Sequence, residues 1–120
     1  MESNFDFPSA FRLKKPAEFK NVFANPVKSS DQYFTLLAIK NNFDYPRLGL
    51  AIAKKNIKKA VYRNIIKRTI RESFRIQQSL GCMDVVVLAK RDAVDVPLEL
   101  LRKSLEKHWL KLVIRCASSS

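Results

Sequence analysis

The feature of this sequence most able to do chemistry is a run of cations between residues 54 and 75. It contains a single acid, Glu72, and its nine cations are Lys54, Lys55, Lys58, Lys59, Arg63, Lys67, Arg68, Arg71 and Arg75. Lysine and arginine bind phosphate oxygens through charge-assisted hydrogen bonds. This run therefore indicates a surface for a polyanion, and nucleic acid is the first candidate.

From Val61 onward the same run has the periodicity of an amphipathic helix. At about 100° per residue, five polar side chains share one arc of roughly 100°: Asn64, Lys67, Arg68, Arg71 and Arg75. Ile66, Ile70 and Phe74 fall on a different arc, which we expect to face a core. An ordinary solvated face is the alternative. Like charges four residues apart repel one another, so a helix that needed only solubility would alternate Glu with Lys.

Side chains that could catalyse a reaction form no recognisable constellation. His108 is the sole histidine, and a lone helical histidine is usually a surface or packing residue. No serine or cysteine has the setting of a nucleophile, and two glycines are too few for a phosphate-binding loop. Asp92 and Asp95 could hold a divalent ion, although two loop carboxylates are usually solvated. We therefore expect no catalytic residue and no metal site in this chain.

Composition supports a nucleic-acid partner. The 120 residues carry a net charge of +12, and 47% of them are hydrophobic, which excludes wholesale disorder. No apolar run approaches the roughly 18 residues of a membrane span, and the amino terminus lacks the cations of a signal peptide. Cys82 and Cys116 fit no zinc motif. A disulfide between them is one alternative, but we expect reduced thiols in a cytoplasmic protein.

The elements that must position the basic helix have the order α-β-β-α-β-α. We predict helices over 16–24, 61–78 and from 97 onward, and strands over 33–39, 48–53 and 84–89, with a polar turn at 28–31. This order indicates an α+β fold in which helices cover a small central sheet. Turn composition at 41–46 predicts that the first two strands pair as a hairpin. Residues 1–120 are expected to form a single RNA-binding domain, with 1–11 and 116–120 flexible.

One segment is specific enough to suggest a family. From Ala53 to Arg75 the chain reads AKKNIKKAVYRNIIKRTIRESFR. This closely resembles the signature of the bacterial ribonuclease P protein subunit, which runs through an Arg-Asn-Arg core, Lys-Arg and Arg-Glu-x-Phe-Arg. Further matches at 12–23, 46–50 and 84–90 extend the resemblance over about residues 12–113.

The resemblance implies a ribonucleoprotein endonuclease that removes the 5′ leader from precursor tRNA. In that family the catalytic RNA subunit carries the active site and holds Mg²⁺, which activates water for phosphodiester hydrolysis. The family fold includes a left-handed βαβ crossover, an exception to the usual handedness. The implied partners are ribonuclease P RNA and precursor tRNA, with no membrane and no obligate protein partner.

The resemblance also implies which residues bind each RNA. The RNA subunit is expected at Lys54, Lys55, Lys58, Lys59, Arg63, Asn64, Lys67, Arg68, Arg71 and Arg75. The single-stranded leader is expected in a cleft lined by Arg12, Lys14, Lys15, Phe19, Phe23, Tyr33 and Leu37. Phe19 and Phe23 lie four residues apart on one helix side, where core packing and stacking on bases are both compatible with the pattern.

Two positions depart from the family pattern. Ile65 stands where the Arg-Asn-Arg core has its second arginine, so one cation is lost. Leu37 stands where the family often has an aromatic residue, and strand alternation suggests Tyr33 as the substitute on the same face. A basic structural RNA-binding protein of ribosomal type is the main alternative function, and a DNA-binding regulator with its helix in a major groove is a second.

Overall fold

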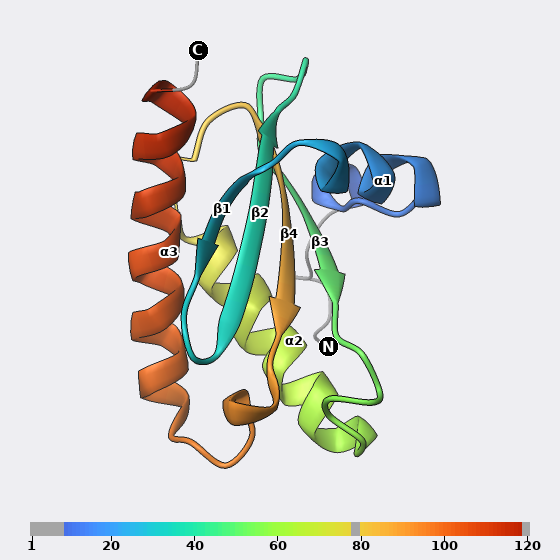
Figure 1. The fold of residues 1–120 in the computed structure, drawn as a ribbon, viewed down its shortest axis with the longest axis vertical. Coiled ribbons are helices and arrows are strands. Elements are labelled where there is room, and N and C mark those ends of the chain that lie inside the picture. Colours follow the sequence, from blue (N-terminus) through green and yellow to red (C-terminus); the bar gives the residue numbers. More distant parts are fainter. Residues whose placement is uncertain (1–8, 78–79, 119–120) are drawn as a thin grey trace.

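The computed structural model describes residues 9–77 and 80–118, which form a four-stranded sheet with helices on both faces (Figure 1). The long elements are α1 (Pro16–Ala24), β1 (Val27–Ser30), β2 (Phe34–Lys40), β3 (Arg47–Ala51), α2 (Ala60–Arg75), β4 (Met83–Ala89) and α3 (Leu98–Ser118). Two short 3-10 helices, η2 (Ser9–Phe11) and η3 (Arg91–Ala93), precede α1 and α3. The α+β class predicted from the sequence is confirmed.

The sheet has the strand order β1-β2-β4-β3. β4 pairs antiparallel with β2 and parallel with β3, so the predicted hairpin between β2 and β3 is wrong. The physical reason is burial: β4 is an almost continuous apolar run, and such a strand belongs in the middle of a sheet with both faces covered. The predicted turn at 28–31 is also wrong, because Val27–Ser30 forms the edge strand β1 against β2.

β3, α2 and β4 form the βαβ unit of the fold. In Figure 1 both strands run downward, β4 lies to the left of β3, and α2 lies behind the sheet. This arrangement is a left-handed crossover, as the family resemblance implied, and differs from the right-handed rule for such units. It places the basic helix on the face of the sheet opposite α1.

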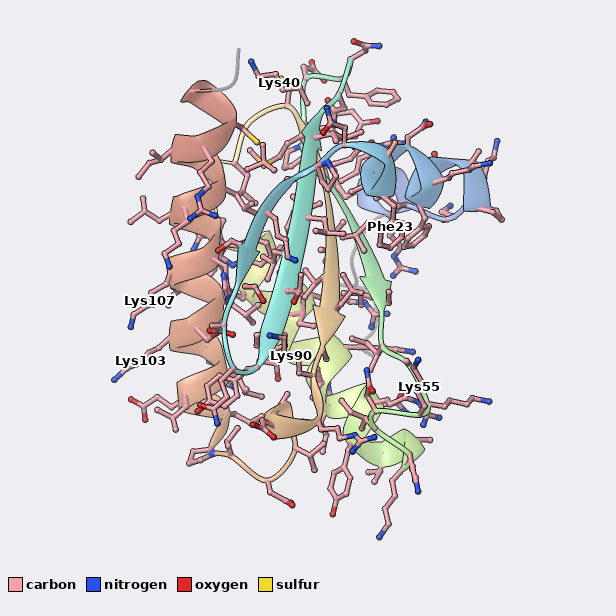
Figure 2. All side chains as sticks on the ribbon, in the orientation of Figure 1. Phe23, Lys40, Lys55, Lys90, Lys103 and Lys107 are labelled. Carbon is pink, nitrogen blue, oxygen red and sulfur yellow. The ribbon has the colours of Figure 1, made fainter. Side chains whose placement is uncertain are left out.

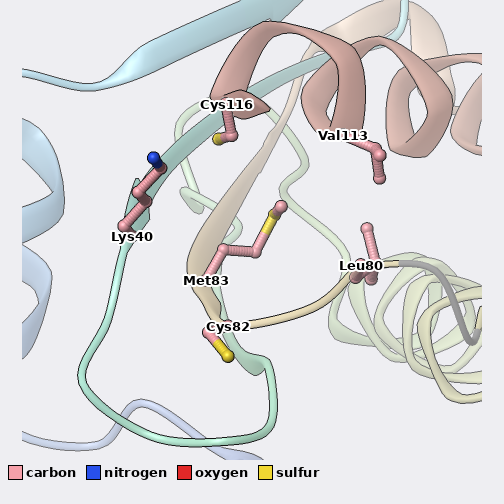
Figure 3. A pocket seen from close by; sticks show the side chains of 6 residues that line it. All are labelled: Lys40, Leu80, Cys82, Met83, Val113 and Cys116. Atoms are coloured by element: carbon pink, nitrogen blue, oxygen red, sulfur yellow. The ribbon is translucent and has the colours of Figure 1, made fainter. Parts of the chain in front are cut away.

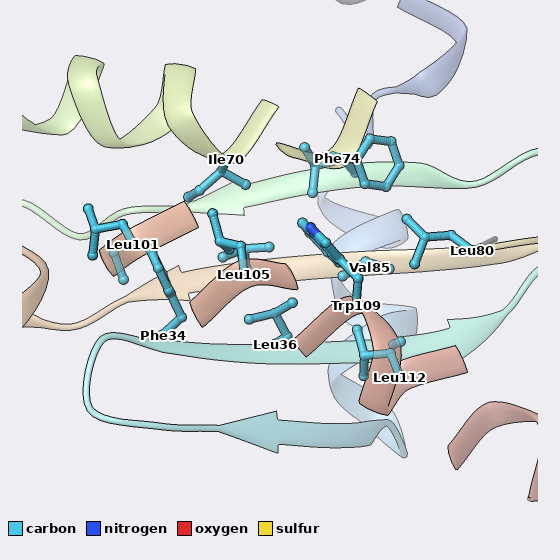
Figure 4. Packing of buried hydrophobic residues seen from close by; sticks show 14 of the residues in the cluster. Phe34, Leu36, Ile70, Phe74, Leu80, Val85, Leu101, Leu105, Trp109 and Leu112 are labelled. Atoms are coloured by element: carbon cyan, nitrogen blue, oxygen red, sulfur yellow. The ribbon is translucent and has the colours of Figure 1, made fainter. Parts of the chain in front are cut away.

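The main core lies between the sheet and the two long helices. Trp109 is 1% exposed on α3, its ring meets Phe74 of α2 edge to face at 5.7 Å, and its Nε1 donates a 2.8 Å hydrogen bond to Ser73 Oγ. Figure 4 shows these rings above Leu36 and Val85 of the central strands. A smaller cluster of Leu13, Val22, Leu37 and Val86 lies on the other face, under α1.

Contacts join the described residues near each end of the chain to the rest of the fold. Leu13 N donates a 2.9 Å hydrogen bond to Leu48 O, so the arm before α1 lies along the free edge of β3. Phe11, in the segment expected to be flexible, meets Tyr45 edge to face at 5.1 Å. At the other end α3 continues to Ser118 and buries Cys116. Residues 1–8, 78–79 and 119–120 lie outside the described part.

Candidate nucleic-acid interface

The basic helix α2 has the two faces that the sequence predicts. Its buried stripe consists of Ile66, Thr69, Ile70, Ser73 and Phe74, all turned toward the core. Asn64, Arg68 and Arg75 are exposed, whereas Lys67 and Arg71 are half-buried. The packing of the apolar stripe against the sheet therefore fixes which way the cations point.

Arg63 has an intramolecular role that the sequence does not reveal. Its Nη1 donates hydrogen bonds to the carbonyl oxygens of Ile57, at 2.9 Å, and Lys58, at 2.7 Å. Ile57 is itself 1% exposed and anchors the loop between β3 and α2 in the core. Arg63 therefore closes this loop onto the first turn of α2, and only part of its guanidinium remains available to a partner.

The loop that leads into α2 presents four lysines to solvent. Lys54, Lys55, Lys58 and Lys59 are all exposed, and Figure 2 shows Lys55 projecting away from the body of the protein. Lys59 Nζ lies 5.9 Å from the centre of the Tyr62 ring, within the range of a cation–π contact. The structure thus brings these four lysines together with the cations of α2 on one side of the molecule.

The aromatic residues of α1 occupy two different environments. Phe19 is half-buried against the sheet and packs on the cluster of Leu13, Val22, Leu37 and Val86. Phe23, which Figure 2 labels on α1, is 45% exposed. Of the two roles considered for this pair, core packing therefore applies to Phe19, whereas Phe23 is available for stacking on a base.

Gly49 allows α1 to approach the sheet this closely. A Cβ atom at position 49 would lie 2.7 Å from Cε1 of Phe19, a distance that real contacts do not reach. Any side chain on this residue of β3 would push the Phe19 ring away from the sheet. The sequence places Gly49 in a strand but gives no signal of the ring that covers it.

An ionic network that sequence reasoning missed ties α1 to the sheet. Arg47 at the start of β3 donates from Nε and Nη2 to the carboxylate of Asp84, at 2.9 and 2.7 Å, and from Nη1 to Glu18 Oε2 at 2.9 Å. Glu18 Oε1 also accepts the backbone N–H groups of Lys15 and Lys14. These backbone hydrogen bonds, followed by the bond from Arg47, lower the pKa of Glu18 to about 2.

The remaining residues expected in the leader cleft are divided between the two faces. Arg12, Lys14 and Lys15 are exposed just before α1, and Leu37 is nearly buried under it. Tyr33 lies in the turn ahead of β2 and packs on the main core, so the prediction that it shares the face of Leu37 is wrong. Strand alternation does not extend to Tyr33, because Asp31 Oδ1 accepts hydrogen bonds from the backbone N–H groups of Tyr33 and Phe34 and holds the turn.

A polar cluster fixes the β1–β2 turn to α3. Ser29 Oγ lies 2.6 Å from Nδ1 of His108, and His108 Nε2 lies 3.1 Å from Asp31 Oδ2, too poorly aligned for a hydrogen bond. Burial lowers the pKa of His108, which is 2% exposed. Burial alone would raise the pKa of Asp31, but hydrogen bonds from Ser104 and from backbone N–H groups outweigh it and lower the pKa to about 2. The His108 ring of this cluster is closed to solvent, and its contacts tie the turn to α3.

Residues 9–77 and 80–118 contain no group of three or more His, Cys, Asp or Glu side chains that could hold a metal ion. Asp92, which lies in η3, accepts a 3.2 Å hydrogen bond from Gln32 Nε2. Both cysteines are free thiols, and burial raises the pKa of Cys116. They line an apolar cavity of about 220 Å³ in which Met83 lies between them (Figure 3).

The geometry of the basic helix and of α1 can be compared with known proteins. The family model for ribonuclease P matches residues 7–113 of the chain. The chain belongs to the ribonuclease P protein family. A relative named "Ribonuclease P protein component", from Methylococcus capsulatus, is 50% identical over 117 residues, which are 97% of this chain and 91% of the relative.

Solved structures of two ribonuclease P proteins share this fold. The protein from Staphylococcus aureus is 34% identical with a TM-score of 0.78, over 86% of this chain and 94% of its own. The protein from Thermotoga maritima is 30% identical with a TM-score of 0.73, over 82% of this chain and 94% of its own. Membership places the chain in tRNA processing as an RNA-binding component of ribonuclease P.

In the part that the structure describes, no helix has the length and apolar content needed to cross a membrane.

Proposed function

We propose that this chain is the protein subunit of a bacterial, cytoplasmic ribonuclease P and holds two RNAs on opposite sides of its sheet. The catalytic RNA subunit binds α2 and the four lysines before it. The 5′ leader of precursor tRNA binds on the α1 side, near Phe23 and the cations Arg12, Lys14 and Lys15. The observation that carries this proposal is the separation of the two surfaces: α1 and α2 cover opposite faces of one sheet.

Electrostatics supports the α2 side of the proposal. Each phosphate that a lysine or arginine neutralises releases bound counterions, so affinity for RNA falls as salt rises. The exposed cations of the loop and of α2 number enough for a strong dependence of this kind. Asn64, exposed among them, adds an amide that can hydrogen-bond a ribose or a base edge.

The leader side combines one exposed ring with a fixed helix. Phe23 can stack on an unpaired base because 45% of its surface is open to solvent. The ion pairs of Arg47 with Glu18 and Asp84 hold α1 in place, so Phe23 is presented from a rigid element. The nearby lysines attract the phosphates on either side of that base.

We assign bond cleavage to the RNA subunit. Magnesium held there would activate water for hydrolysis of the phosphodiester, leaving a 5′ phosphate on the tRNA and a 3′ hydroxyl on the leader. The role of this chain is then to raise the affinity for precursor tRNA and to neutralise phosphates that would otherwise repel one another in the folded RNA.

The test is cleavage of precursor tRNA at low magnesium by a cognate RNA subunit, with and without this chain. The proposal predicts strong stimulation of cleavage, and a substrate without a leader should lose most of the gain in affinity. No stimulation would contradict the proposal. Co-purification of ribosomal RNA in place of a single RNA of ribonuclease P would instead favour a structural ribosomal role.

A further inference from the structure

Three apolar side chains are exposed at the first turns of α2, beside the face that carries the cations. Val61 is 58% exposed, and Tyr62 and Ile65 are 38% exposed. Val61 and Ile65 are four residues apart, so they lie one above the other on the helix surface, and Tyr62 lies beside them. We name these three residues the apolar strip. Adjacent exposed apolar side chains on a small protein often mark a contact with a partner.

The apolar strip lies along the border of the cationic face. At about 100° per residue, Ile65 falls between the exposed Arg68 and the buried Thr69. Thr69 Oγ1 donates a 2.9 Å hydrogen bond to Ile65 O, so this turn of the helix is well fixed. The strip is therefore a rigid surface, and it continues the face whose charge we assign to RNA.

The charges around the strip limit what can cover it. Lys58 and Lys59 are exposed directly before the helix, and Arg68 is exposed one turn after Ile65. Lys59 Nζ stands over the Tyr62 ring at 5.9 Å from its centre. A partner that fits must carry negative charge next to a flat apolar surface. An unpaired nucleobase with its flanking phosphates has this combination.

We propose that the apolar strip contacts an unpaired base of the catalytic RNA subunit while Lys58, Lys59 and Arg68 bind the phosphates beside it. The proposal rests on the assignment of α2 to that RNA. Ile65 occupies the position at which the related signature has an arginine, so this chain replaces an ionic contact with an apolar one. An apolar contact releases no counterions, and it therefore adds affinity without adding to the salt dependence.

The first experiment measures the affinity of transcribed cognate RNA subunit across a series of salt concentrations. The double variant Val61→Ala/Ile65→Ala removes most of the strip and keeps good helix formers. We expect binding about five- to tenfold weaker at every salt concentration, with an unchanged slope of log affinity against log salt. The matched control is Leu110→Ala/Ile114→Ala, which truncates an equally spaced pair, 61% and 58% exposed, on α3. This control should bind like the parent chain.

A second experiment identifies the contact as a base. Base-specific chemical modification of the RNA should show one or a few bases protected by the parent chain and reactive again with Val61→Ala/Ile65→Ala. Protection of the neighbouring riboses from hydroxyl radicals should persist. The variant Ile65→Arg should restore an ionic contact and steepen the salt slope by about one.

Several results would overturn the inference while leaving the proposed function intact. Parent-like affinity of Val61→Ala/Ile65→Ala would show that the strip touches no RNA. If Val61→Ala/Ile65→Ala lost the parent chain's binding to vesicles of anionic phospholipid but kept its affinity for RNA, the strip would belong to a membrane surface. An equal loss of RNA affinity in Val61→Ala/Ile65→Ala and in the control Leu110→Ala/Ile114→Ala would show that the effect is not specific to the strip. By contrast, a parent chain that binds no ribonuclease P RNA at any salt concentration would remove the proposed function itself.

Discussion

The guanidinium of Arg47 lies between two carboxylates from distant parts of the chain, with Nη1 2.9 Å from Glu18 Oε2 and Nη2 2.7 Å from Asp84 Oδ2. Glu18 belongs to α1 and Asp84 to β4, so this one side chain on β3 ties three elements together. Phe43 covers its outer face, with the ring centre 4.4 Å from Cζ. Because α1 carries Phe23, the position of the surface that we propose for the leader depends on this network.

Replacing Arg47 with alanine should destabilise the protein strongly. Asp84 is 5% exposed, and removing its partner would leave a buried carboxylate without its ion pair. Breaking such a pair costs about 3–5 kcal/mol, to be measured by urea denaturation. The matched control is Lys103→Ala, which breaks an ion pair with Glu99 whose side chains are 64% and 75% exposed, and should cost about 0.5 kcal/mol. Equal losses for the two variants would refute the role assigned to Arg47.

The substitution Gly49→Ala should push Phe19 off the sheet. Overpacking of this kind typically costs about 1–3 kcal/mol, and here the new methyl group would stand 2.7 Å from the Phe19 ring. The double variant Gly49→Ala/Phe19→Leu should recover part of the loss, because the smaller side chain leaves room for the methyl group. Equilibrium unfolding of the parent, both single variants and the double variant gives the coupling energy. Additive losses would mean that the two residues do not interact.

Stability should decrease in acid partly through Asp31. Its pKa is about 2 in the folded protein against an ordinary value of 3.8, so the folded state favours the carboxylate. This contribution is complete above pH 3.8 and is lost as pH falls toward 2. For a carboxylate that is 35% exposed, we expect about 1 kcal/mol after solvent screening.

Unfolding free energies of the parent chain and of Asp31→Asn between neutral pH and pH 2 test this expectation. Glu18 also has a pKa of about 2 and titrates in both proteins, so the difference between the curves isolates Asp31. The curve of the variant should be flatter in acid. Parallel curves would show that Asp31 has no favourable environment in the fold.

The free protein should gain structure when sulfate or phosphate is added. A net charge of +12 on 120 residues repels itself in a compact state at low ionic strength. Anions that bind the folded cation surfaces shift the equilibrium toward the native state. Far-UV circular dichroism during titration with sulfate, against chloride at matched ionic strength, measures this effect. A spectrum that no anion changes would contradict it.

Local pattern was sufficient to predict the basic helix and the class of fold. The alternation of cations with Ile66, Ile70 and Phe74 requires one buried and one charged face wherever the helix packs. The apolar run of residues 85–89 in β4 likewise determines that this strand lies inside a sheet. The pairing of strands was not predictable in the same way. The composition at 41–46 predicts a turn, but it does not determine whether the strand after the turn pairs with the strand before it.

The errors arose where distant residues decide the structure. β1 has the composition of a turn, yet Ser29 is buried because His108 of α3 lies 2.6 Å away. The network of Arg47 joins residues that are 29 and 37 positions apart, and no local motif marks them. Gly49 matters only through Phe19 above it. Such relationships become visible only when the sheet and its helices are assembled.

The central claim is that the cations of α2 are the surface for the catalytic RNA, and charge reversal at matched sites tests it most directly. Lys67→Glu/Arg68→Glu changes two residues of α2, and Lys103→Glu/Lys107→Glu makes the same change in net charge on α3, where Figure 2 shows both lysines pointing away from the sheet. Affinities for the cognate RNA subunit at one fixed salt concentration are compared. We predict a loss of roughly a hundredfold or more for the α2 variant and a small loss for the α3 variant. Equal losses would mean that net charge alone governs binding, and undiminished binding by the α2 variant would contradict the account.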